Sequence, residues 1–207
     1  MSKLLIEPHY LGSLEYFTLL SQYDAIELEV NDTFKKQTYR NRAHFLGANK
    51  VHALIVPLSY GHQTKTKDVK IDYNQRWIKD HWGAFYSYYG KAPFFEFFSE
   101  DYKAIWEQKP TFLIDLLLAF FRFHFKILGM SQPISTTTSF EDQGVENDFR
   151  NVILPKESFN CRKIYRPVPY IQLFGDNFVS NLSVVDLIMS QGTESPNTLQ
   201  ESRIRGQ

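Results

Sequence analysis

Six consecutive polar residues, 37–42, are the strongest candidate for chemistry in this sequence. If the stretch is extended, successive side chains point to opposite sides of the chain. One side then carries Gln37, Tyr39 and Asn41, and the other carries Thr38, Arg40 and Arg42. Two guanidinium groups two residues apart suit a carboxylate or a phosphate, which arginine binds through parallel hydrogen bonds. The alternative is a solvated edge strand whose charges prevent pairing with another chain.

The histidines are the second source of candidate chemistry. His81 lies on an expected helix over residues 74–89, where it falls between the apolar side and the solvated side, on the same stripe as Trp77. A histidine at such a boundary suits a general base, and the alternative is a structural histidine bonded to a carbonyl group. His124 faces away from the polar stripe of the expected helix over residues 111–128. We therefore expect it to be a hydrogen-bonded core residue.

Composition and charge narrow the class of protein. The 207 residues carry 23 Lys and Arg and 23 Asp and Glu, so no overall field gathers polyanions around the molecule. Cys161 is the only cysteine, which excludes an internal disulfide and fits a reducing compartment. The most apolar segment, residues 112–128, contains four polar residues, whereas a membrane span needs about 20 largely apolar ones. With no signal peptide at the start, we expect a cytoplasmic protein.

No familiar cofactor or metal motif is present in the sequence. The six histidines lack the spacing of metal ligands, and there is no glycine-rich phosphate loop and no nucleophile elbow. We therefore expect neither a metal nor a cofactor.

The first thirty residues read as a strand, a helix and a strand, over residues 3–6, 14–23 and 25–30. Short connections between them favour a parallel crossover unit. The loop over residues 8–13, which contains His9 and Tyr10, then lies at the carboxyl end of the first strand. Open α/β sheets bind ligands at that edge.

The rest of the chain completes an α/β fold with a mixed, largely parallel sheet covered by aromatic-rich helices. We expect a hairpin over residues 40–58, further strands at 69–73 and 170–174, and helices at 74–89, 93–108, 111–128 and 182–189. Residues 134–151 are polar and are expected to be mainly loop. A mobile segment or a lid is one interpretation of this stretch. One domain over residues 1–190 and a polar, frayed tail over 191–207 complete the expectation.

A series of short motifs, in order along nearly the whole chain, resembles the WbqC family of bacterial proteins in the form common among Bacteroidetes. The motifs are Pro8-His9-Tyr10-Leu11, Glu15-Tyr16-Phe17, residues 36–42, Leu54-Ile55-Val56-Pro57, Asp68-Val69, Trp77 with His81-Trp82, Ala92-Pro93-Phe94-Phe95-Glu96 and residues 181–187. One departure concerns Glu7, which stands where much of the family has Gln.

The resemblance implies a role in the synthesis of surface polysaccharide (O-antigen), as a transferase of an acyl or aminoacyl group such as glycine. In this hypothesis His81 and His9 are the catalytic residues, and His81 takes a proton from an acceptor amine or hydroxyl group. Substrate contacts are expected from Tyr10, Gln37, Tyr39, Arg40, Asn41, Arg42 and Trp77. The expected partner is an anionic small molecule or an activated acyl donor.

Three alternatives stay open at this point. One is a nucleotidyltransferase-like nucleotide-binding protein, with phosphates near the loop after the first strand. Another is an RNA- or tRNA-binding module that uses Lys35, Lys36 and the two arginines on phosphates, although zero net charge disfavours nucleic acid. The third is a non-catalytic scaffold with the aromatic helices as its interface. The sequence does not decide between a monomer and a homo-oligomer.

Overall fold

The chain folds into strands and helices in nearly the order that the sequence predicts. The structure, a computed structural model, describes residues 2–141 and 145–204. In chain order its strands and α-helices are β1 (Lys3–Ile6), α1 (Leu14–Leu20), β2 (Ala25–Leu28), β3 (Arg42–Leu46), β4 (Val51–Ile55), β5 (Leu58–Ser59), β6 (Lys70–Ile71), α2 (Trp77–Tyr89), α3 (Phe95–Glu107), α4 (Leu113–Ile127), β7 (Ile134–Thr136), α5 (Val184–Gln191) and α6 (Ser195–Glu201). The predicted mixed α/β class is confirmed.

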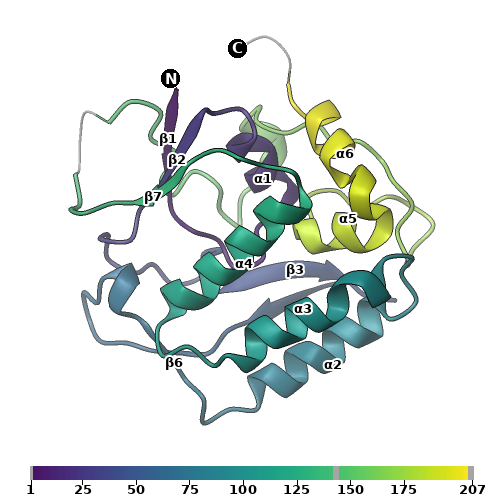
Figure 1. The fold of residues 1–207 in the computed structure, drawn as a ribbon, viewed down its shortest axis with the longest axis horizontal. Helices are drawn as coiled ribbons and strands as arrows, with labels where there is room; N and C mark the ends of the chain where they lie inside the picture. The colour runs from purple at the N-terminus through teal and green to yellow at the C-terminus, as the bar shows by residue number, and fades with distance from the viewer. Residues whose placement is uncertain (1, 142–144, 205–207) are drawn as a thin grey trace.

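Three parallel strands form the sheet of the amino-terminal unit (Figure 1). Their order is β1-β2-β7, and the crossover from β1 to β2 runs through α1. The Ser13 hydroxyl caps α1 by accepting a hydrogen bond from the Tyr16 N–H. The predicted strand, helix and strand are therefore confirmed, although α1 ends before Tyr23. β7 was not predicted, because it lies in the segment expected to be mainly loop. A lid role for residues 134–151 stays a prediction, and residues 142–144 lie outside the described residues.

The predicted hairpin is formed by β3 and β4. Its register places Arg42 opposite Ile55 and Leu46 opposite Val51, and the hairpin is a sheet of its own, separate from the parallel one. β5 and β6 form a second short antiparallel pair, so the strand predicted at residues 69–73 is present in a shorter form.

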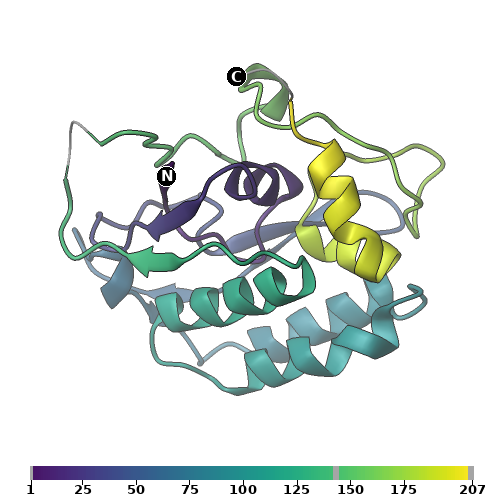
Figure 2. The same ribbon diagram turned by 45° about the horizontal axis from the view of Figure 1, so that its top comes forward.

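The helices α2 and α3 lie side by side at the edge of the molecule farthest from β1, and α4 lies between them and the parallel sheet (Figures 1 and 2). α4 contributes to both cores of the protein. Phe121 and Phe125 belong to the core around α1, the parallel sheet and α5, and Leu116 and Phe120 belong to the core around α2, α3 and the hairpin. In the described part of the chain, no helix is both long enough and apolar enough to cross a membrane.

His124 of α4 is buried, and its ring lies against Phe17 of α1 and Tyr102 of α3. Its Nε2 lies 2.9 Å from the hydroxyl of Tyr102, which is itself buried. The prediction of a hydrogen-bonded core histidine is therefore confirmed.

Two predictions for the C-terminal third are wrong. Residues 170–174 do not form a strand. The hydrogen bonds of this segment run through its side chains instead: Tyr170 donates to Asp186, and the Gln172 amide bonds to both the N–H and the carbonyl oxygen of Val179. The expected frayed tail contains α6, whose Leu199 is buried in the core. Residues 205–207 lie outside the described residues. The division into one domain over residues 1–190 stays a prediction.

Candidate functional site

Buried charged side chains gather at the carboxyl ends of the parallel strands. Glu7 follows β1 directly, Glu29 and Asp32 follow β2, and all three are buried. This edge is where open α/β sheets bind ligands. A buried carboxylate is costly unless other groups pair with it, so the partners of these three residues define the site.

Glu7 and His9 form a buried pair on the loop after β1. His9 Nε2 lies 3.4 Å from Glu7 Oε1, and the imidazole stacks on the ring of Tyr16. Burial by itself would raise the pKa of Glu7, but the His9 hydrogen bond, the Arg40 charge and the Asn151 N–H outweigh it and lower that pKa to about 2. Burial lowers the pKa of His9, which is therefore neutral at neutral pH.

The protonation state of Glu7 decides which nitrogen of His9 carries the hydrogen. An ionised carboxylate only accepts hydrogen bonds, so Nε2 of the neutral ring donates to it and Nδ1 carries the lone pair. Nδ1 is buried and finds no hydrogen-bond partner among the described residues. The pair thus presents an unused base inside the protein.

Arg40 is the cation beside Glu7 and Asp32 in this cluster and is completely buried. Its Nη2 donates to Asp32 at 2.6 Å and to the Asn151 side chain at 3.3 Å, and its Nη1 lies 3.8 Å from Glu7 Oε1. Burial raises the pKa of Asp32, although Arg40 and the Thr66 hydroxyl oppose that shift. Because two carboxylates face Arg40, its charge is already offset and it is a poor site for a further anion.

Residues 37–41 form turns, so the prediction of a strand with two faces is wrong. Gln37 has a φ of 60°, a left-handed conformation that interrupts an extended chain, and its side chain is exposed. Only Arg42 lies in a strand, as the first residue of β3. Arg40 is enclosed in the interior, whereas Arg42 is half-buried. The alternative of a solvated edge strand is also wrong for Arg40.

Tyr39 and Asn41 hold this turn against its neighbours. The carbonyl oxygen of Tyr39 accepts a hydrogen bond from the Tyr10 N–H, which ties the turn to the loop after β1. The Tyr39 ring lies 5.4 Å from the rings of both His9 and His44. The Asn41 amide donates to the carbonyl of Val56. These contacts place Tyr39 beside the Glu7–His9 pair, and the Asn41 side chain holds the backbone at Val56.

Tyr10, Trp77 and His81 lie together in the other core, around α2, α3 and the hairpin. The Ile55 carbonyl accepts from His81 Nε2 at 3.2 Å, so Nδ1 accepts from the Tyr10 hydroxyl at 2.9 Å. Trp106 donates in turn to that hydroxyl. Burial lowers the pKa of His81 to about 4, although the bond to Ile55 opposes the shift. Both ring nitrogens are engaged, as in the structural alternative, and a catalytic role for His81 stays a prediction.

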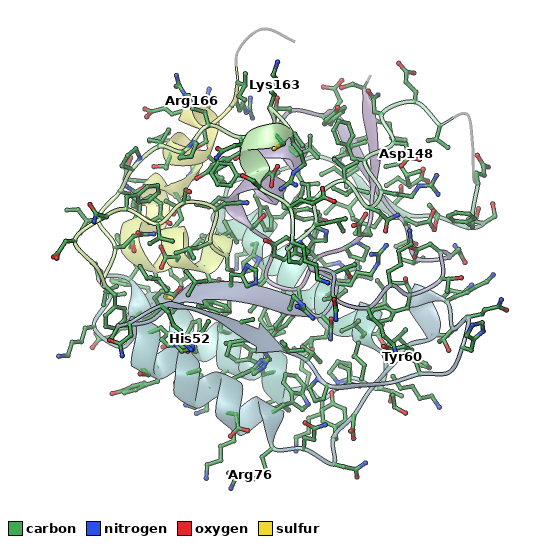
Figure 3. The ribbon with its side chains drawn as sticks, turned by 180° about the vertical axis from the view of Figure 1, so that it is seen from behind. His52, Tyr60, Arg76, Asp148, Lys163 and Arg166 are labelled. Carbon is green, nitrogen blue, oxygen red and sulfur yellow. The ribbon has the colours of Figure 1, made fainter. Side chains whose placement is uncertain are left out.

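Two arginines from the C-terminal third complete the cluster, and sequence analysis identified neither. Arg150 donates to Glu29 at 2.9 Å and grips Asp148, which Figure 3 shows beside β1. Arg162 holds both carboxylate oxygens of Glu15 at 2.7 Å. Glu29 lies 121 positions from Arg150, and Glu15 lies 147 positions from Arg162, so no rule based on sequence spacing predicts these two pairs. For Arg162 the available signal was Glu15 itself, the single charged residue of α1.

A small cavity of about 300 Å³ lies beside the cluster. Its charged lining residues are three cations and one acid: Lys35, Lys36, Lys156 and Glu157. Asn151 forms part of the same wall, while its side chain accepts from Arg40 and its N–H donates to Glu7. Asn151 thus connects the basic cavity to the buried Glu7–His9 pair.

The chemistry that this arrangement offers is proton transfer next to a place for an anion. A neutral histidine with a free lone pair beside an ionised carboxylate is the combination that general bases use. Cations not already offset by carboxylates lie at the cavity rather than at Arg40. Among residues 2–141 and 145–204, no three or more His, Cys, Asp or Glu side chains are grouped to hold a metal ion.

Comparison with known proteins supports the resemblance drawn from the motifs. The model of the WbqC-like protein family matches residues 7–160, a range that contains Glu7, His9, Arg40 and Arg150 and ends just before Arg162. No curated protein and no solved structure matches the chain.

Proposed function

Because this chain belongs to the WbqC-like protein family, we propose that it transfers an acyl or aminoacyl group, glycine included, during the synthesis of a surface polysaccharide. The donor is an activated, anionic acyl compound, and the acceptor is an amine or hydroxyl group. The family resemblance supplies the biological setting of this proposal. The buried cluster at the end of the parallel sheet supplies its chemistry.

The observation that carries the proposal is the unpartnered Nδ1 of His9 beside an ionised Glu7. A carboxylate bonded to one imidazole nitrogen fixes the tautomer and leaves the other nitrogen ready to accept a proton. The lowered pKa of His9 keeps the ring in its basic form at neutral pH. Since both nitrogens of His81 are engaged, we assign the base to His9.

In the proposed reaction the acceptor nitrogen or oxygen attacks the carbonyl carbon of the donor. One bond forms at that carbon, and the bond to the leaving group breaks. The proton released by the acceptor passes to His9 Nδ1 and from there to the leaving group. Glu7 stays ionised and stabilises the imidazolium that forms between these two steps.

The anionic part of the donor binds in the cavity lined by Lys35, Lys36 and Lys156. His9 is buried, and Asn151, which lines the cavity, bonds to its partner Glu7. The reacting groups therefore reach His9 when Asn151 moves aside and gives up its hydrogen bonds to Arg40 and Glu7. Closure afterwards excludes water, which would otherwise hydrolyse the activated donor.

The variant His9→Gln tests this proposal. A glutamine amide replaces the Nε2 donor to Glu7 but removes the basic nitrogen, so the fold is kept and the base is lost. In cells that lack the native gene, mass spectrometry of the surface polysaccharide measures the acyl and aminoacyl groups restored by each variant. We expect wild type and the exposed control His62→Gln to restore them and His9→Gln to fail. Full restoration by a normally folded His9→Gln protein would show that His9 is not the base.

A further inference from the structure

A basic groove lies between α2 and α3, away from the buried cluster. Its cavity of about 600 Å³ is within the range of small-molecule sites. The charged residues that line it are four cations and one acid: Arg76, Lys79, Lys103, Lys109 and Glu107. Figure 3 shows Arg76 at the opposite side of the molecule from Asp148, the exposed partner of Arg150.

The cations of the basic groove are poorly neutralised. Lys103 lies 3.8 Å from Glu100 and also packs its ammonium group over the ring of Trp82, 5.4 Å from the centroid. Arg76, Lys79 and Lys109 form no ion pair within residues 2–141 and 145–204. In a chain with a formal net charge of zero, this is a local excess of positive charge that a bound anion would relieve.

The same groove offers an aromatic surface held in a fixed position. Tyr73 lines the groove and is 37% exposed, and its hydroxyl donates to the Pro110 carbonyl at 2.8 Å. The Trp77 ring lies behind it, at 6.0 Å between centroids. An aromatic ring anchored in this way is a platform on which a planar heterocycle can stack.

We propose that the basic groove binds a small ligand that joins a phosphate chain to a planar ring, as in a nucleoside diphosphate or triphosphate. Arg76, Lys79 and Lys109 hold the phosphates, and Tyr73 stacks on the ring. The size of the cavity and the zero net charge favour a mononucleotide over a nucleic-acid strand. The groove is separate from the His9 site, so this inference does not depend on the transferase proposal.

Intrinsic fluorescence provides a direct measurement of this binding. The chain has three tryptophans; Trp82 and Trp106 line the basic groove, and Trp77 lies behind Tyr73. The full-length protein is titrated with ATP, adenosine, tripolyphosphate and a single-stranded oligonucleotide. We expect a saturable change with ATP that weakens as salt rises, and binding of the other three probes that is weaker by about tenfold or more.

Charge-reversal variants identify the groove as the site. Arg76→Glu with Lys79→Glu changes two exposed residues and should weaken ATP binding by about tenfold or more. The matched control, Arg122→Glu with Lys126→Glu, makes the same charge change at exposed positions of α4 and should leave the affinity unchanged. The proposal is overturned by the absence of a saturable signal at millimolar ATP, by an equal loss in the control, or by tripolyphosphate or the oligonucleotide binding as tightly as ATP.

Discussion

The buried guanidinium of Arg40 donates a hydrogen bond of 2.6 Å to the carboxylate of Asp32. Arg40 comes from the turn before β3, and Asp32 comes from the loop after β2. The Thr66 hydroxyl donates to the second oxygen of Asp32, also at 2.6 Å. This one contact therefore joins the polar stretch, the parallel sheet and the segment that leads to β6.

Removing one member of this pair should be more harmful than removing both. Arg40→Gln leaves Asp32 and Glu7 as buried carboxylates without their cation, and breaking a buried ion pair in this way costs about 3–5 kcal/mol. The double variant Arg40→Gln with Asp32→Asn should recover part of that loss. Urea unfolding of the two single variants, the double variant and wild type measures the coupling, and strictly additive losses would show that the pair is not coupled.

Glu7 should make stability depend on pH in the acid range. Its pKa is lowered to about 2 from an ordinary value of 4.5, so its ionised form stabilises the fold above about pH 4.5. That contribution is lost as the pH falls from about 4.5 to about 2. The difference in unfolding free energy between wild type and Glu7→Gln should therefore be largest above pH 5 and shrink toward pH 2. Unfolding in urea across that range is the measurement, and a constant difference would contradict the assignment.

His81 should also make stability depend on pH, over a higher pH range than Glu7 does. Its pKa is lowered to about 4 from 6.5, so the unfolded chain binds a proton before the folded protein does, and stability falls as the pH drops from about 6.5 to about 4. His81→Gln removes this loss, so the stability advantage of wild type over the variant should narrow across that window. Urea unfolding gives the difference, and NMR titration of the imidazole checks the pKa directly. An imidazole that titrates near 6.5 in the folded protein would be inconsistent with the burial of His81.

Two glycines should respond to alanine in opposite directions. Gly192 has a φ of 54°, and a Cβ there would lie 2.3 Å from the ring of Phe94, so Gly192→Ala should destabilise by roughly 2–4 kcal/mol. Gly83 is exposed inside α2 with open space around its Cβ position, so Gly83→Ala should stabilise by about 0.5–1 kcal/mol. Thermal unfolding measures both, and a loss of stability in Gly83→Ala would contradict the packing around α2.

Local patterns predicted the elements that local forces build. The parallel unit, the hairpin and the helices α2, α3 and α4 follow from apolar periodicity and turn residues. For α5 the cap Ser183 adds a signal, since its hydroxyl accepts from the Val185 N–H. The segment at residues 170–174 misled the same reasoning. Its Ile171 is 91% exposed, and its polar groups bond to Asp186 and Val179, so an apolar run was not evidence of a strand.

The candidate site was predicted in part. The sequence pointed to the loop that carries His9 and to the stretch that carries Arg40, and the structure brings these two together around Glu7. It separates them from Tyr10, Trp77 and His81, whose side chains lie in the other core. Tyr10 follows His9 in the chain, yet the two side chains take part in different clusters, because the chain turns at Tyr10: His9 lies beside Glu7, whereas the Tyr10 hydroxyl bonds to His81.

The sequence by itself determined that the chain forms an α/β fold with an opening strand, helix and strand, because periodicity and capping act over a few residues. It also determined which residues carry charge and which rings are available. Only the tertiary structure decided that Arg40 is enclosed by Asp32 and Glu7, and that Arg162 reaches Glu15 across 147 positions. The physical reason is that a buried charge needs a partner close in space, and spatial closeness between distant segments is set by the packing of the whole chain.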